Sequence, residues 1–193
     1  MAYIGKTPTP VPLTSSDITD GIVSIADLAT TGTASSSTFL RGDGAFAEAG
    51  GGKVLQVVST QINSVFQTAS SSFVDVTGFT ADITPSATSS KVLIWLSSVI
   101  GNSSSSTNRF RLLRGSTDLA PAADGTGFWE GNISSMGNQH MSFQFCFLDS
   151  PSTTSATTYK LQTLVDVGTM YVGSRPGGAN QCSSTITLME IGA

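Results

Sequence analysis

Acid–base chemistry in this chain would depend on three carboxylates that share one polar interval, Asp118, Asp124 and Glu130. Two such groups at a suitable separation suffice for glycoside hydrolysis. Carboxylates can also collect a calcium ion, although the spacing here matches no EF-hand loop. Solvated loop charges explain the pattern better than either site, so we expect neither a catalytic pair nor a bound metal.

A Ser-His-Asp arrangement or a histidine-based metal site would have to use His140, because it is the only histidine of the chain. The sequence contains no GxSxG elbow and no HExxH pattern. A lone histidine directly before the apolar run "MSFQFCF" is typical of a turn or a strand edge. These observations predict a protein that is not an enzyme and has no cofactor.

Recognition chemistry is better supported, in the long interval between predicted strands from Gly115 to His140. This interval holds Phe128, Trp129, Asp124 and Asn132 among small residues. An aromatic ring can cover the apolar face of a sugar while amides and carboxylates bond its hydroxyls. The two aromatic residues could equally pack between subunits of an oligomer, so both interpretations stay open.

A second candidate for recognition is the segment "GTMYVGSRPGGANQC", where Tyr171, Arg175 and Asn180 bracket a turn rich in glycine and proline. Arg175 precedes Pro176, which favours an extended and projecting conformation. We expect this turn to contribute to the same kind of binding surface.

The tripeptide Arg41-Gly42-Asp43 has the form of an integrin-binding signal. Its neighbours favour a structural role instead. The apolar residues on either side are expected to be buried; they are Phe39, Leu40 and Phe46. Gly42 and Gly44 permit positive φ and a tight reversal between them. We therefore predict a joint in which Arg41 pairs with Asp43 of the same or a neighbouring chain.

The first part of the chain, to about Gly52, has no sustained period that could close a core. Alternating prolines in "KTPTPVPL" favour an extended start. After it, Ile18, Ile22, Ile25 and Leu28 recur at three- and four-residue spacing and form one narrow apolar stripe. So short a segment is marginal as an isolated helix, so it needs copies of itself or another protein. Whether it is helical or extended stays open.

Three glycines before Lys53 mark the predicted boundary between a segment of residues 1–52 and a domain of residues 53–193. From Val54 onward, seven to nine strand-like runs follow one another, separated by Ser, Gly, Asn and Pro. The run "VLIW" is apolar on both faces and should be central. The prediction is a mainly β protein with a C-terminal antiparallel β-sandwich, and the number of short strands favours a jelly roll.

The composition excludes two classes of partner. Charged residues make up 11% of the chain, the formal net charge is -4, and Lys and Arg are scattered, so nucleic-acid binding has no electrostatic basis. No run approaches the roughly 18 apolar residues of a membrane span. Cys146 and Cys182 lack CxxC spacing and lie in or beside apolar runs, which predicts buried reduced thiols.

The segment "TASSSTFLRGDGAFAE" resembles a segment of tail-fibre and other virion fibre proteins of bacteriophages. The stretches "VPLTSSDITDGIVSIADLA", "FLDSPSTTSATTYKLQ" and "TITLMEIGA" are similar to short fibres of marine tailed phages. The chain departs from long fibres in having almost no shaft and no collagen-like repeat. Tailspikes that degrade polysaccharide look like long β-helices, for which this domain is too short.

The resemblance implies a homotrimer with an attachment peptide, a thin stalk and a distal knob like the jelly rolls of the C1q and tumour-necrosis-factor type. The residues assigned to virion attachment are Tyr3, Ile4, Pro8, Pro10 and Pro12. The stalk and the trimer contacts would be formed by the apolar stripe and by the segment around the tripeptide. These residues are Ile18, Ile22, Ile25, Leu28, Phe39, Leu40, Arg41, Asp43 and Phe46.

The expected function is therefore that of a non-enzymatic virion fibre, assembled in the host cytoplasm. Its N-terminus would dock on another virion protein, a tail adaptor or nozzle or the capsid, and its knob would bind a host-surface glycan. The alternative is an architectural head fibre or decoration protein of the capsid without a receptor.

Overall fold

The computed structural model describes residues 30–48, 53–123, 127–133, 140–177 and 182–192. It divides the chain between Gly51 and Gly52 into two compact units, and each is described here by itself. The predicted attachment residues Tyr3, Ile4, Pro8, Pro10 and Pro12 lie outside the described residues, as does the stripe Ile18, Ile22, Ile25 and Leu28.

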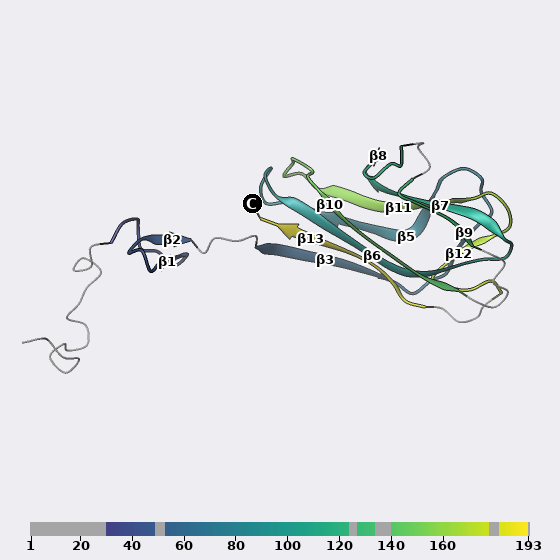
Figure 1. Ribbon diagram of the computed structural model, residues 1–193, viewed down its shortest axis with the longest axis horizontal. Coiled ribbons are helices and arrows are strands. Elements are labelled where there is room, and N and C mark those ends of the chain that lie inside the picture. Colours follow the sequence, from purple (N-terminus) through teal and green to yellow (C-terminus); the bar gives the residue numbers. More distant parts are fainter. Residues whose placement is uncertain (1–29, 49–52, 124–126, 134–139, 178–181, 193) are drawn as a thin grey trace, which may run out of the picture. The chain divides into compact units, whose positions relative to one another are not determined.

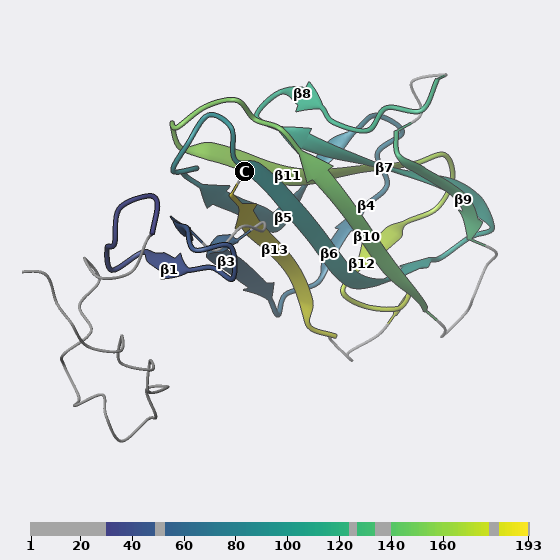
Figure 2. The same ribbon diagram turned by 60° about the vertical axis from the view of Figure 1, so that its left-hand side comes forward.

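The second unit is built from two antiparallel sheets (Figure 1). The first, which we call the β6 sheet, has the order β3 (Val54–Ile62), β13 (Ser184–Ile191), β6 (Lys91–Asn102) and β10 (Met141–Asp149). Short strands β12 (Met170–Val172) and β4 (Phe66–Thr68) extend it beyond the start of β13, because β12 pairs with the last residues of β6. Figure 2 shows β13, β6 and β10 side by side.

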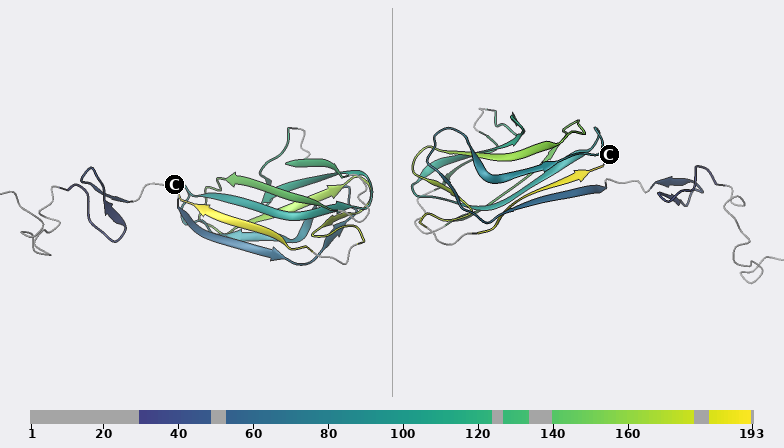
Figure 3. Two further views of the ribbon diagram at one scale, coloured as in Figure 1. Left: turned by 60° about the horizontal axis from the view of Figure 1, so that its bottom comes forward. Right: turned by 180° about the vertical axis from the view of Figure 1, so that it is seen from behind.

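The second sheet, which we call the β7 sheet, has the order β5 (Val74–Ile83), β11 (Thr157–Val165) and β7 (Ser106–Arg114). Two short strands pair with the far edge of β7: β8 (Thr117–Asp118) near its end and β9 (Trp129–Ile133) near its start. The two sheets stack as layers, as the views from below and behind show (Figure 3).

The predicted antiparallel β-sandwich is confirmed, since the described residues contain thirteen strands and no helix. The central place predicted for "VLIW" is confirmed too, because β6 pairs with β13 on one side and β10 on the other. The interval from Gly115 to His140, where the sequence predicts no strand, contains β8 and β9. These strands are short and have little apolar alternation, so their pairing with β7 is not visible in the pattern.

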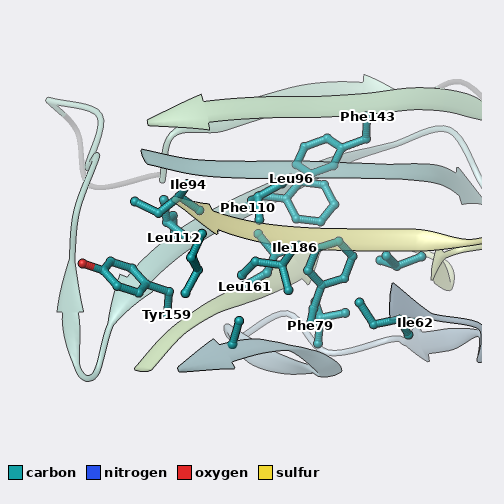
Figure 4. Packing of buried hydrophobic residues seen from close by; sticks show 14 of the residues in the cluster. Ile62, Phe79, Ile94, Leu96, Phe110, Leu112, Phe143, Tyr159, Leu161 and Ile186 are labelled. Carbon is teal, nitrogen blue, oxygen red and sulfur yellow. The ribbon is translucent and has the colours of Figure 1, made fainter. Parts of the chain in front are cut away.

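Strict alternation in the strands creates the core. In β13, Ile186, Leu188 and Glu190 are buried while the residues between them stay partly exposed, as the sequence predicts. The matching positions of the other sheet supply Phe110, Leu112, Tyr159 and Leu161, all fully buried (Figure 4). Apolar side chains from both inner faces therefore meet in one layer, as in other aligned sandwiches.

Two buried carboxylates, Asp149 and Glu190, lie at one end of this layer. In the register of the sheet, Val92 of β6 pairs with Asp149 on one side and with Glu190 on the other. Asp149 accepts hydrogen bonds from the Tyr159 hydroxyl at 2.7 Å and from Arg114 at 2.7 Å, which ties β10 to the β7 sheet. Burial in the core, first, and then the hydrogen bond to Asp149 raise the pKa of Tyr159 well above its ordinary value. The hydroxyl therefore stays protonated and keeps donating.

Glu190, the second carboxylate, accepts hydrogen bonds from the Ser86 backbone N–H at 2.7 Å, the Ser86 hydroxyl at 2.6 Å and the Gln56 amide at 2.7 Å. Burial by itself would raise the pKa of Glu190, but these donors, together with Ser90, outweigh it and lower the pKa to about 2. The ionised carboxylate thus holds the β5–β6 connection and β3 against β13.

Replacing Phe110 by Ala removes a ring from the centre of the core and should lower the free energy of unfolding by about 3–5 kcal/mol. Urea denaturation of the full chain measures this loss. Val167→Ala is the control, because Val167 is exposed and its truncation should cost less than about 0.5 kcal/mol. Equal effects at the two positions would contradict the described core.

Replacing Glu190 by Gln should destabilise the sandwich by about 1–3 kcal/mol at neutral pH, because an amide cannot accept from all these donors. The pH dependence has a definite sign. Since the folded-state pKa lies below the ordinary value of 4.5, the contribution of Glu190 is complete above about pH 4.5 and is lost as the pH falls towards about 2.

Urea midpoints measured between neutral and acid pH should therefore converge for wild type and Glu190→Gln as the pH drops. Glu48→Gln, an exposed change outside the sandwich, controls for the loss of one charge. A constant difference between wild type and Glu190→Gln at all pH values would show that the ionised carboxylate is not what stabilises the fold.

Candidate functional site

The Arg41-Gly42-Asp43 segment closes a hairpin between β1 (Thr38–Leu40) and β2 (Phe46–Glu48). Arg41 N–H donates to the Ala45 carbonyl at 2.8 Å, and Gly44 N–H donates back to the Arg41 carbonyl at 2.9 Å. Asp43 accepts from the Ala45 N–H at 3.1 Å. Gly44 has a φ of 79°, which favours glycine, whereas Gly42 does not have positive φ.

The two charges of the tripeptide face each other within one chain. Arg41 Nη2 lies 3.5 Å from Asp43 Oδ2, and both side chains are more than half exposed. An ion pair this exposed contributes little stability by itself, so the hydrogen bonds of the turn do most of the positioning. The predicted pairing of Arg41 with Asp43 therefore exists within the same chain.

The apolar neighbours of the tripeptide are not covered in the single chain, and their predicted burial in an oligomer stays a prediction. Phe39 is 62% exposed and Leu40 48% exposed, and Phe46 is only partly buried. Thr31 adds one bridge: its N–H donates to Gly44 and its carbonyl accepts from Phe46. A hairpin of two short strands is marginal in water by itself. Its exposed apolar side chains are thus available to a partner.

The two predicted recognition segments lie at the same end of the sandwich. Lys53 and Gly192 are joined by a backbone hydrogen bond at the end where β6 begins, next to Ile191. Tyr171 pairs with Gly101 near the other end of β6, and Asn132 pairs with Thr107 just after the turn that follows. Figure 1 shows β9 and β12 at the end far from the C-terminus.

The aromatic pair Phe128 and Trp129 belongs to a cluster within the chain. The Phe128 ring stacks on Phe145 with centroids 3.8 Å apart, and Trp129 lies 5.5 Å from Phe110 and edge-on to Phe143. Both residues are partly buried and pack against the core cluster. The cluster leaves each ring only part of its surface for a sugar or a second subunit, and the prediction of binding there stays a prediction.

Tyr171 lines a shallow pocket of about 290 Å³ together with Val65, Gln67 and Gly177. The pocket offers one ring and one amide, which is the pairing expected for a sugar. Arg175 is partly buried rather than fully projecting, and it makes its own interaction in the structure. Asp124 and Asn180 lie outside the described residues, and the side chain of Asn132 does too.

Two of the three candidate carboxylates for chemistry are described, and both are paired with arginines. Glu130 accepts from Arg109 Nε at 2.8 Å, and Asp118 lies 3.4 Å from Arg111 Nε. Within the described ranges, no group of three or more His, Cys, Asp or Glu residues is arranged to hold a metal ion. His140 is exposed and directly precedes β10, the strand-edge position expected from the sequence.

The two cysteines are free, as predicted, but the expected burial is wrong for Cys146, which is exposed, and Cys182 is only partly buried. Cys146 lies on the outward face of β10, directly opposite Trp95 of β6. The run "FQFCF" carries a signal for this, because its phenylalanines alternate with Gln144 and Cys146 and the phenylalanine side packs on the core, which leaves Cys146 on the outward side with Gln144.

In the part of the chain that the structure describes, no helix is long and apolar enough to cross a membrane. No sequence profile of a known protein family matches the chain, and no curated protein matches it.

Among solved structures, the viral particle of infectious bursal disease virus aligns with 76% of this chain and 39% of its own, at 12% identity and a TM-score of 0.39. The VP2 subviral particle of that virus aligns with 76% of this chain and 41% of its own, at 13% identity and a TM-score of 0.38. This chain spans about two fifths of the length of those viral chains. Similarity at this level assigns neither a family nor a function.

Removing the Asp43 side chain should loosen the hairpin. Asp43→Ala deletes the acceptor for the Ala45 N–H and the partner of Arg41, at an expected cost of about 0.5–1 kcal/mol in local stability. Amide hydrogen exchange at Ala45 should become faster, and thermal unfolding of the full chain should begin earlier. Cell binding should not change.

Asp43→Asn is the matched control, because its amide oxygen can still accept from Ala45 while the ion pair is lost. It should behave closer to wild type. If both variants unfold like wild type yet lose binding to cells, the tripeptide is an adhesion signal and not a joint.

Proposed function

We propose that this protein is a homotrimeric virion fibre of a bacteriophage, with the sandwich as its outward knob. The observation that carries the proposal is the hairpin closed by Arg41-Gly42-Asp43-Gly44, whose Phe39 and Leu40 are uncovered in the single chain. This hairpin is also the segment that resembles virion fibres. Two further copies would cover the exposed apolar side chains and bring three chains into register.

The strand order of the sandwich supports its proposed role as a jelly-roll knob. Counted along the chain, the eight main strands are β3, β5, β6, β7, β9, β10, β11 and β13. The first, eighth, third and sixth form one sheet, and the second, seventh, fourth and fifth form the other. This is the order of an eight-stranded jelly roll, the type of knob that the resemblance implies.

Recognition of a host-surface glycan belongs to the end of the sandwich that holds β9 and β12. The chain begins the sandwich at the opposite end, at Lys53, so a knob held from that side would present this end outward. The Tyr171 pocket is the first candidate there. The N-terminal segment would dock on a tail adaptor or nozzle or on the capsid, and assembly would take place in the host cytoplasm. No catalytic step is part of the proposal.

A second candidate is an architectural head fibre or decoration protein of the capsid. One observation favours it: Phe128 and Trp129 are engaged in the chain's own aromatic cluster instead of standing free for a ligand. In that case the sandwich would ornament or stabilise the particle without a receptor.

Light scattering of the full-length protein tests the trimer. A trimer of 19.9 kDa chains has a native mass of about 60 kDa, three times the chain mass under closed three-fold symmetry. That mass is the expected result. A monomer at micromolar concentration would contradict the fibre and would favour a subunit that assembles only on the particle.

Competition for adsorption separates the two candidates. Purified trimer should block attachment of the phage to host cells, and Tyr171→Ala should weaken the block about tenfold, the loss of one ring–sugar contact multiplied over linked sites. Thr77→Ala, an exposed change on β5, is the control. If the wild-type trimer does not compete at all, the architectural candidate is preferred.

A further inference from the structure

The outer faces of the two sheets differ in charge. On the β7 sheet, Lys160 pairs with Asp75 at 2.9 Å, and Arg109 pairs with both Glu130 and Asp166 at 2.8 Å. The strands of the β6 sheet contain three charged residues, Lys91, Asp149 and Glu190, and the two acids point inward and are buried. Lys91 alone points outward, at the very start of β6.

The outward face of the β6 sheet is an uncharged surface that crosses four strands. The strand register places its side chains in rows. One row is apolar and consists of Val57, Met189, Leu93 and Leu148. The next row consists of Ser59, Thr187, Trp95 and Cys146. The third consists of Gln61, Thr185, Ser97 and Gln144. We call these three rows the neutral face.

Large apolar side chains on the neutral face are exposed to a degree that the other sheet does not show. Val57 is 56%, Trp95 47% and Leu148 48% exposed. No large apolar residue of β5, β7 or β11, the long strands of the β7 sheet, is exposed in this way. A contiguous apolar area on a water-soluble domain marks an interaction surface, whereas scattered single residues need no explanation.

We propose that the neutral face is where the sandwich packs against other copies of this chain, an inference that rests on the trimer of the proposed function and assigns its contact surface. The net charge of the chain favours another copy of it as the partner at this face. Each chain carries a net charge of -4, so copies that meet through charged surfaces repel one another, while the neutral face brings no like charges together.

The polar groups of the neutral face also suit self-association. Hydroxyls and carboxamides both donate and accept hydrogen bonds, so each can pair with the same kind of group on another copy. Ser59 and Thr187 already pair in this way across strands at 2.9 Å. The apolar row would supply the buried area, and Trp95 has the size and aromatic character typical of residues that dominate interface energies.

Cys146 provides a reporter inside the neutral face, because it is exposed in the single chain and lies opposite Trp95. In full-length protein we expect a bulky maleimide to alkylate Cys146 at least about tenfold more slowly than in a chain whose neutral face is open, since the reaction needs access to the thiol. Mass spectrometry of peptides separates Cys146 from Cys182.

Two lysine variants should disrupt the contact between copies at the neutral face. Leu148→Lys and Val57→Lys each add a charge at an exposed edge position, which the single sandwich tolerates because the side chain reaches water. Both should restore rapid alkylation of Cys146, whether or not the stalk keeps the native mass at three chains. Val57 lies on the edge strand opposite to β10, so its lysine cannot speed the reaction by acting directly on the thiol.

Thr77→Lys is the matched control on the β7 sheet and should leave Cys146 protected. A full-length trimer whose Cys146 reacts rapidly would overturn the inference and leave the fibre proposal intact, with the stalk as the sole contact. A monomer with a reactive Cys146 would overturn both. A monomer with a protected Cys146 would show that another segment of the same chain covers the face, which also overturns the inference.

Discussion

The arrangement of the sandwich depends on the hydrogen bonding of β6 along both its edges. Nine residues of β10 pair with one edge, and the other edge pairs first with β13 and then with β12. A slip of one residue would turn Val92, Ile94 and Leu96 outward and expose the core, so burial of one face fixes the register. The inward position of Glu190 and the outward position of Trp95 both follow from that register.

Alternation along the strands makes most of this fold predictable from sequence. The long runs from Val54 to Ile191 were identified because one side must be apolar, and the boundary glycines were visible as a change in composition. Strands β8 and β9 were not predicted, because they pair with β7 over only a few residues and their pattern is set by that pairing. The jelly-roll order was favoured only by strand number, since pairing partners lie far apart in the chain.

Sites were less predictable than strands, for reasons that particular residues illustrate. Trp129 was singled out as a candidate for sugar binding or subunit packing, but its sequence neighbours say nothing of Phe110 and Phe143, which meet it through pairing of distant strands. The flanks of Arg41 were expected to be buried, but one short hairpin cannot cover them by itself, and the sequence of one chain does not identify the surface that would. The neutral face could not be predicted from the sequence, because each of its rows combines single residues from four separate strands.

The few charged residues of this chain are divided unevenly between the two sheets. A soluble sandwich of this size needs charge on its surface, and most of the charged residues of the described strands are on the β7 sheet, where ion pairs cover its outer face. The β6 sheet uses its two acids as internal clamps instead, with Asp149 on Tyr159 and Glu190 on Ser86. Its outer face is thereby left without charge. A protein that acted as a separate monomer would gain solubility from charges there, so a neutral outer face is consistent with the proposed packing of this sheet against other copies of the chain.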